Sequence, residues 1–212
     1  MAFCDYDKVL LFGDSITEQS FEQTRGFASG AALSDAYRRK LEVLNRGFSG
    51  YNTAHALHVL PQIIPPPTDT CRIRLVILFF GANDAVLPGQ LQHVSVSNYR
   101  RNLHTILTHP LLLAHNPKFI LITPPAMCEY TAEECDRAKG KPITQRQQAN
   151  TKLYVDAALS VGEELKIPTI NLWKAWTESH AMGKEYPGSR ELPRNQNFLT
   201  LLRDGLHFNP QG

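Results

Sequence analysis

Four short segments of the chain contain residue types that could together attack an ester. They are residues 13–15 (GDS), 47–50 (GFSG), 81–84 (GAND) and 204–207 (DGLH). In this order they supply a serine hydroxyl, a glycine N–H, an asparagine amide and an Asp-x-x-His pair. A nucleophile needs a general base, and the oxyanion that forms needs donors already in place. The segments therefore predict an active site, provided that the fold brings them together.

Ser15 and Ser49 are the two candidate nucleophiles. Ser15 begins a Ser-x-x-Glu pattern, which would also allow its hydroxyl simply to cap a helix. Ser49 follows a glycine and a phenylalanine, but Tyr51 stands where a G-x-S-x-G nucleophile motif has its last glycine. Neither serine can be assigned from its own segment alone.

Gly50, Asn83, Asp204 and His207 are the candidates for the remaining roles. A glycine lets its backbone N–H approach a reacting oxygen closely, and an asparagine amide can donate to an oxyanion. A carboxylate at Asp204 could accept the Nδ1–H of His207, which would leave Nε2 free to take a serine proton. Each also has a structural explanation, as a turn residue or as a solvated surface pair. Asp84 is expected to stabilise a turn or cap rather than to take part in the chemistry.

The sequence predicts a parallel α/β sheet that could carry these segments. Residues 75–80 read LVILFF, which is typical of a strand buried on both faces. Four other short apolar runs, and between them four stretches of helical period, complete an alternation that predicts one doubly wound domain. The expected strands are residues 8–12, 42–44, 75–80, 119–122 and 168–172, and the expected helices are residues 27–41, 54–64, 99–107 and 149–165.

The first three chemical segments each directly follow an expected strand. In an open parallel sheet, binding sites form at the carboxyl ends of the strands, so these segments should share one edge. Two polar segments, residues 127–142 and 181–193, are predicted as irregular loops that border the site.

Composition and charge narrow the class of protein. A net charge of +2, with 42% hydrophobic and 20% charged residues, predicts a packed core and gives no argument for nucleic-acid binding. No apolar run approaches the ~18 residues of a membrane span, and the N-terminus lacks a signal-peptide layout. The four cysteines show no metal-ligand spacing. We therefore expect free thiols in a cytoplasmic protein without metal or cofactor.

Taken together, the four segments resemble the sequence blocks of the SGNH (GDSL-type) hydrolase superfamily. The resemblance covers nearly the whole chain, with residues 13–17 (GDSIT), 47–53 (GFSGYNT), 81–84 (GAND) and 204–207 (DGLH) as the matching blocks. Within the superfamily, the longer stretches FGDSIT, NRGFSGYNT and DGLHFNPQG are similar to those of isoamyl acetate-hydrolysing esterases.

The resemblance implies both a fold and a set of roles. The fold would be a flavodoxin-like three-layer α/β/α sandwich with a five-stranded parallel sheet and no metal. Ser15 would be the nucleophile and His207 the general base, with Asp204 orienting the imidazole. The oxyanion hole would consist of the backbone N–H groups of Ser15 and Gly50 and the side chain of Asn83.

The resulting expectation is a serine esterase that acts on short-chain, acetate-type esters through an acyl-enzyme. The alternatives are a carbohydrate or phospholipid acetylhydrolase, or a non-catalytic flavodoxin-like module that binds an anion at the 13–17 turn. Met127 and Tyr130 are expected in the substrate pocket, whereas Trp173 and Trp176 are expected to pack helices.

A last expectation concerns the C-terminal end of the sequence. Members of the superfamily usually continue past the last block into a closing helix, whereas this chain stops at Gly212. We expect a single domain over residues 1–212 without that helix. The sheet surface that it would cover could then mediate association of two copies.

Overall fold

The computed structural model describes residues 6–141, 145–179 and 185–212. Within them, five parallel strands form one sheet in the order β2-β1-β3-β4-β5. This is the order of flavodoxin-like doubly wound folds, and it confirms the predicted fold class. The strands are β1 (Lys8–Gly13), β2 (Glu42–Gly47), β3 (Ile73–Phe79), β4 (Lys118–Ile122) and β5 (Thr169–Ile170).

The central strand β1 shows why the sheet forms. Val9, Leu10 and Phe12 have no exposed surface, so consecutive residues are buried on both faces, as expected for a strand covered by helices on each side. Gly13, the last residue of β1, pairs with Gly47 of β2 and Phe79 of β3. The carboxyl ends of these strands are therefore level, as the positions of the chemical segments predicted.

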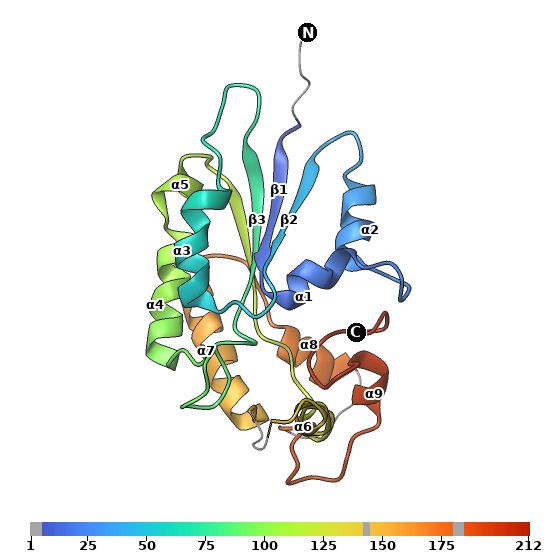
Figure 1. The fold of residues 1–212 in the computed structure, drawn as a ribbon. Coiled ribbons are helices and arrows are strands. Elements are labelled where there is room, and N and C mark those ends of the chain that lie inside the picture. Colours follow the sequence, from blue (N-terminus) through green and yellow to red (C-terminus); the bar gives the residue numbers. More distant parts are fainter. Residues whose placement is uncertain (1–5, 142–144, 180–184) are drawn as a thin grey trace.

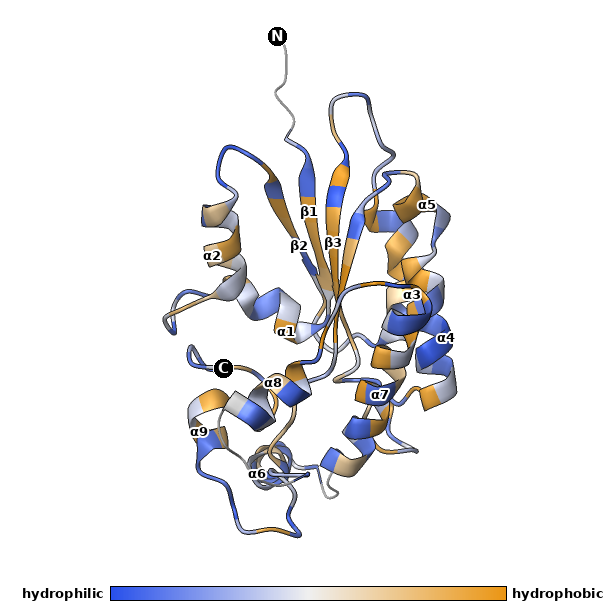
Figure 2. Ribbon diagram, turned by 180° about the vertical axis from the view of Figure 1, so that it is seen from behind, coloured by the Kyte–Doolittle hydropathy of each residue, from blue (hydrophilic) through white to orange (hydrophobic). Residues whose placement is uncertain are grey.

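Helices cover the two faces of the sheet unequally (Figure 1). On one face, α3 (Thr53–Ile63), α4 (Val96–Leu107) and α7 (Gln148–Glu164) enclose the largest apolar core, with Tyr99 and Tyr154 fully buried within it. The other face carries the short α1 (Ser15–Glu18), the 3₁₀ turn η1 (Gln19–Phe21) and α2 (Ser29–Ala36). Figure 2 shows the apolar strands between these two layers.

A third group of helices lies beyond the carboxyl ends of the strands, at the bottom of Figure 1. It comprises α6 (Glu129–Ala138), α8 (Leu172–Ser179) and α9 (Asn197–Leu201); the remaining short helix, α5 (Pro110–Leu113), follows α4. Trp173 and Trp176 of α8 are buried in an apolar cluster with Phe198, which confirms that they pack helices.

Two sequence expectations need correction. The helix expected over residues 27–41 extends only over α2, whose C-cap is Tyr37, and a turn follows in which Arg39 takes a positive φ of 65°. The segment 127–142 is not an irregular loop, since α6 occupies most of it, and residue 142 lies outside the described residues. Of the second expected loop, residues 181–184 also lie outside them, and residues 185–193 form turns.

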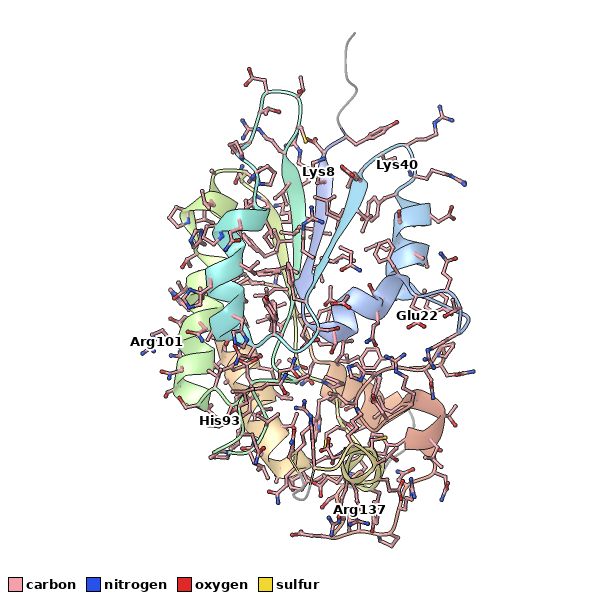
Figure 3. The ribbon with its side chains drawn as sticks, viewed as in Figure 1. Lys8, Glu22, Lys40, His93, Arg101 and Arg137 are labelled. Atoms are coloured by element: carbon pink, nitrogen blue, oxygen red, sulfur yellow. The ribbon has the colours of Figure 1, made fainter. Side chains whose placement is uncertain are left out.

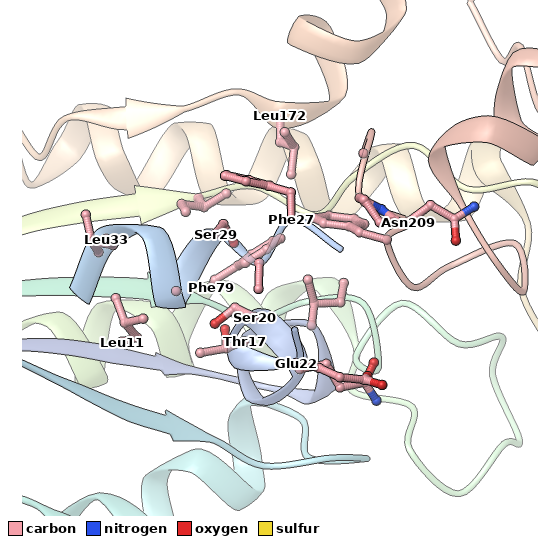
Figure 4. A pocket seen from close by; sticks show the side chains of 18 of the residues that line it. Leu11, Thr17, Ser20, Glu22, Phe27, Ser29, Leu33, Phe79, Leu172 and Asn209 are labelled. Carbon is pink, nitrogen blue, oxygen red and sulfur yellow. The ribbon is translucent and has the colours of Figure 1, made fainter. Parts of the chain in front are cut away.

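The less covered face of the sheet contains a cavity of about 440 Å³. It is lined by Leu11 and Phe79 of the sheet, by Phe27 and Leu33 from the α2 side, and by Gly212. Figure 4 shows apolar side chains from the sheet, from α2 and from Leu172 around it. Apolar sheet surface therefore stays open beside α1.

Charged side chains project from the outer surface. Lys40, Arg101 and Arg137 point away from the molecule (Figure 3). Among the described helices, none is both long enough and apolar enough to cross a membrane.

Candidate active site

Ser15 is the first residue of α1, directly beyond the carboxyl end of β1. The residue that caps this helix is Asp14, whose side chain accepts a hydrogen bond of 2.9 Å from the N–H of Ile16. The structure thus corrects the capping explanation of Ser15, whose hydroxyl is left for another partner. At the first helical position, the backbone N–H of Ser15 also has no acceptor within the helix.

That partner is His207, from the other end of the sequence. The Ser15 Oγ lies 2.8 Å from the His207 Nε2, and the His207 Nδ1 lies 2.7 Å from the Asp204 Oδ2. The three side chains that the sequence nominated are therefore joined by two hydrogen bonds in the order serine, histidine, aspartate.

The surroundings of Asp204 determine which atoms of the three side chains carry protons. Burial acts to raise the pKa of its carboxyl, but hydrogen bonds from the side chain and backbone of His207 and from the Leu206 N–H hold the pKa well below its usual range. Asp204 is therefore a carboxylate, which can only accept. The His207 Nδ1 must donate to it, and in the neutral imidazole Nε2 is left as the acceptor for the Ser15 hydroxyl.

The loop that carries Asp204 and His207 is held firmly. The backbone N–H of Arg203 donates to the His207 carbonyl at 3.0 Å, and the N–H of Cys128 donates to the Gly205 carbonyl at 2.9 Å. Leu206 is 8% exposed and packs in an apolar cluster with Ile16 and Phe79. These contacts connect the loop to α6, to α1 and to the sheet, although it lies close to the end of the chain.

Backbone and amide bonds join the second and third segments to the first. The N–H of Phe48 donates to the Gly13 carbonyl at 3.0 Å. The Nδ2 of Asn83 donates to the Tyr51 carbonyl at 2.9 Å, and Asn83 is only 3% exposed. A continuous set of hydrogen bonds therefore extends from β1 through the 47–50 segment to Asn83.

Gly50 adopts a conformation that few other residues could take. Its φ is +81°, and its carbonyl accepts a hydrogen bond of 2.7 Å from the Gln92 side chain. In the described part of the chain its N–H has no acceptor. Ser49, by contrast, is exposed, and its N–H donates to the Glu18 carboxylate at 2.7 Å. Among the described residues, His207 bonds the hydroxyl of Ser15 and not that of Ser49.

Asp14, the residue before Ser15, and Asp84 of the 81–84 segment are both buried. Asp84 has no exposed surface and accepts from both the N–H and the hydroxyl of Thr53, at 3.0 and 2.5 Å, so it supports the start of α3, as its expected structural role requires. Burial raises the pKa of Asp84 to about 6 and that of Asp14 to about 7. Both groups are therefore much more readily protonated than an exposed aspartate.

Arg146 is a site residue that the sequence analysis missed. Its Nη1 donates to the Ala82 carbonyl at 2.5 Å and its Nη2 to the Asn83 Oδ1 at 3.2 Å. It lies in a polar stretch just before α7, and no local motif distinguishes it from the other arginines. Only the folded chain shows that it reaches the 81–84 segment.

Met127 and Tyr130, expected in the substrate pocket, have other neighbours. Met127 has no exposed surface and packs with Ile16 and Leu206. The Tyr130 hydroxyl donates to the Leu192 carbonyl at 2.6 Å. Packing and this hydrogen bond account for both side chains, and a contact with substrate stays a prediction.

A metal site would need several His, Cys, Asp or Glu side chains grouped around one position. Among the described residues, no three His, Cys, Asp or Glu side chains are arranged to bind an ion. Cys71, Cys128 and Cys135 are free thiols, and Cys4 lies outside the described residues.

Comparison with known proteins relates nearly the whole chain to one protein family. Residues 11–212 match the sequence model of the GDSL-like Lipase/Acylhydrolase family. The "Isoamyl acetate-hydrolyzing esterase 1 homolog" of Rattus norvegicus is 38% identical over 211 residues, which cover 98% of this chain and 77% of that protein. The "Isoamyl acetate-hydrolyzing esterase" of Saccharomyces cerevisiae is 33% identical over 218 residues, which cover 98% and 82%.

Solved structures show the same architecture. A lipase/acylhydrolase from Enterococcus faecalis has a TM-score of 0.60 and 30% identity, over 96% of this chain and 87% of its own. A catalytic mutant of Axe2, an acetylxylan esterase from Geobacillus stearothermophilus, has a TM-score of 0.64 over 100% of this chain and 90% of its own. At 20% identity, this second likeness concerns the fold alone.

Proposed function

Because the chain belongs to the GDSL-like lipase/acylhydrolase family, we propose that it cleaves short-chain, acetate-type esters through an acyl-enzyme formed on Ser15. Its general activity, carboxylic ester hydrolysis, follows from the family and the esterase relatives. The proposal adds the mechanism and the substrate. The observation that carries it is the 2.8 Å separation between the Ser15 Oγ and the His207 Nε2, with Asp204 on the far side of the imidazole.

In the first step, the Ser15 Oγ attacks the ester carbonyl carbon while the His207 Nε2 takes the hydroxyl proton. The electron pair of the carbonyl π bond moves to the carbonyl oxygen, which becomes an oxyanion. Asp204 remains a carboxylate and stabilises the imidazolium that has formed. Its low pKa supports this assignment, since a neutral carboxyl would not hold the Nδ1–H in place.

The oxyanion would be stabilised by three donors. They are the backbone N–H groups of Ser15 and Gly50 and the Nδ2–H of Asn83. Such donors act on charge that is absent from the substrate, so they lower the barrier more than they strengthen binding. The rigid sheet edge supports this role, because positioned donors need no rearrangement when the charge appears.

The tetrahedral intermediate then collapses. Its C–O bond to the alcohol breaks, and the imidazolium of His207 gives its proton to the leaving alkoxide. A water molecule enters, loses a proton to the same Nε2 and attacks the acyl carbon. The C–O bond to the Ser15 Oγ then breaks, and the imidazolium of His207 returns its proton to that oxygen. This releases the acid and restores the Ser15 hydroxyl and the neutral imidazole, so proton and charge are balanced over the cycle.

The acyl preference is supported by the relatives named for isoamyl acetate, which are 38% and 33% identical to this chain over nearly its whole length. An acetyl group on a carbohydrate or phospholipid is the second candidate, because the same attack on an acetyl carbonyl serves any alcohol. A substrate panel would separate these possibilities.

The experiment combines a substrate panel with a label on the nucleophile. We expect p-nitrophenyl acetate to be hydrolysed faster than longer acyl esters and a fluorophosphonate to modify Ser15, located by mass spectrometry. Ser15→Ala should abolish both, whereas the exposed Ser49→Ala serves as the matched control. Turnover should persist in EDTA. Full turnover by Ser15→Ala, or a loss on chelation that zinc restores, would overturn the mechanism.

We also propose that the protein acts in the cytoplasm. The free thiols of Cys71, Cys128 and Cys135 support this, since reducing compartments keep thiols unpaired. Fractionation of cells that express the tagged chain would test the location, and recovery in a secreted or oxidising compartment would contradict it.

A further inference from the structure

Arg146 lies directly behind the Asn83 amide. Its guanidinium forms two hydrogen bonds to consecutive residues of the 81–84 segment, one to the Ala82 carbonyl and one to the Asn83 side-chain oxygen. Both acceptors belong to the turn that follows β3, whereas Arg146 itself precedes α7. The guanidinium therefore joins two distant parts of the chain at the proposed oxyanion hole.

These bonds determine how the Asn83 amide is oriented. An arginine can only donate, so the group that faces it must be the amide oxygen. The NH₂ group of Asn83 must then point the other way, where one hydrogen bonds the Tyr51 carbonyl at 2.9 Å. Among the described residues the second hydrogen has no acceptor, so it is available to an oxyanion. Without Arg146, the amide could turn over and present its oxygen to the negative charge.

Arg146 also brings a positive charge to this position. It takes part in no ion pair with the described acidic residues, and it is only partly exposed. Asp136, Asp14 and Asp204 are near enough to act on it through space. A cation that is not neutralised by a contacting carboxylate polarises the amide to which it donates and favours negative charge nearby, the more so where water is excluded.

A neighbouring contact provides a comparison. The Nδ2 of Asn150 donates to the Ala85 carbonyl at 2.7 Å, so it holds the same turn from the same part of the chain. Among the described residues, its side chain donates to Ala85 and not to Asn83. A role of Arg146 in simply holding the turn would therefore be shared by Asn150, whereas a role in orienting the amide would not.

Resting on the function proposed above, we infer that Arg146 is a positioning residue that orients and polarises the Asn83 amide for the oxyanion. It touches no reacting atom and acts only through Asn83. The inference thus predicts an effect on the transition state and little effect on substrate binding.

The main test compares Arg146→Gln with Arg146→Lys, using p-nitrophenyl acetate. Arg146→Gln removes the charge and the fork of donors, and we expect kcat to fall about 10- to 100-fold with KM changed less than about 3-fold. Arg146→Lys keeps the charge and should retain more kcat. Asn150→Ala, the control for a loosened turn, should lower the melting temperature without a comparable loss of kcat.

A double-mutant cycle with Asn83→Ala shows whether Arg146 acts through the amide. We expect the double variant Asn83→Ala/Arg146→Gln to be no slower than Asn83→Ala alone, within about 3-fold, because the orientation of a missing amide cannot matter. Inhibition by a boronic acid, whose adduct with Ser15 places an oxygen in the hole, should weaken in parallel with kcat.

Three results would overturn the inference. They are unchanged kcat in Arg146→Gln, a kcat for Arg146→Gln at least equal to that of Arg146→Lys, and losses that multiply fully in the double variant. The function proposed above fails separately, since it requires that Ser15→Ala abolish turnover whatever Arg146 does.

Discussion

The backbone N–H of Cys128 donates a hydrogen bond of 2.9 Å to the carbonyl of Gly205, and this bond ties the loop that carries His207 to the N-cap of α6. Gly205 has a φ of +84°, and a Cβ at this position would lie 2.5 Å from the Ala132 nitrogen and 2.6 Å from the Cys128 oxygen. Both atoms belong to backbone that cannot rotate away. The close approach of the two segments therefore depends on a residue without a side chain.

We predict that Gly205→Ala displaces this loop and with it His207. A positive φ and a backbone clash together should cost about 1–3 kcal/mol of unfolding free energy. A shift of ~1 Å at the base should lower kcat about 100-fold. Thermal melts and ester turnover measure the two effects.

Gly140→Ala is the matched control for that experiment. Gly140 also has a positive φ, of +75°, but an added Cβ there would meet nothing within 4 Å. It should lose some stability through its backbone conformation and keep its kcat. If Gly205→Ala behaves as Gly140→Ala does, then the contact with α6 does not position the base.

Asn83→Ala should lower kcat by roughly 10²–10³ with a smaller change in KM, because the amide acts on charge that develops in the transition state. The same side chain also donates to the Tyr51 carbonyl, so the melting temperature must be measured alongside. A kcat equal to that of the unmodified protein would remove Asn83 from the oxyanion hole.

The raised pKa of Asp14 should make stability depend on pH. Its pKa is about 7 in the folded protein and near 3.8 in an unfolded chain. Between about pH 4 and pH 7 the folded state keeps a proton that the unfolded state has lost, so the unfolding free energy decreases as the pH rises. Asp14→Asn, which retains a capping oxygen, should weaken this decrease.

Denaturant melts at a series of pH values would measure this decrease in unfolding free energy, with Asp84→Asn for comparison. Asp84 has a pKa of about 6, so its contribution should end about one pH unit lower. Stability curves of Asp14→Asn and the unmodified protein that run parallel from pH 4 to pH 7 would show that Asp14 is ionised throughout.

The 440 Å³ cavity on the sheet face should accept an added helix. Apolar side chains such as Leu11, Phe27 and Phe79 line it, and so does Gly212. We predict that an amphipathic helix fused after Gly212 raises the melting temperature and reduces any self-association, because it covers this surface. A Gly-Ser extension of equal length is the control. Equal melting temperatures for the two fusions would contradict the prediction.

The strands and the three long helices beside them were predictable because their apolar residues follow simple patterns. β1 and β3 are nearly continuous apolar runs, and α4 has a stripe that includes Tyr99 and Leu103. The catalytic candidates could be identified because each belongs to a short sequence segment that contains the residue types its role requires. The distances that join Ser15, His207 and Asp204 agree with the roles expected of them.

α6 was not predictable in the same way. Its buried residues include Glu129 and Thr131, which a pattern search reads as surface. Their burial is possible because distant groups satisfy them, such as the Gln148 N–H that donates to Glu129 at 2.7 Å. Arg146 was missed for a related reason. Only its hydrogen bonds identify it as a site residue, and their acceptors lie more than sixty positions away in the sequence.

The proposed nucleophile Ser15 and the proposed general base His207 are 192 positions apart in the chain. Ser15 stands at the carboxyl end of the central strand, whereas His207 lies in a loop outside the sheet, held by backbone hydrogen bonds and by the packing of Leu206. Loops outside a sheet open at a lower free energy than its core strands. Under mild denaturant, catalysis should therefore disappear in a local opening while the sheet and its helices remain folded. Inactivation and global unfolding are then two separate transitions, and dilution of the denaturant restores turnover without refolding of the core.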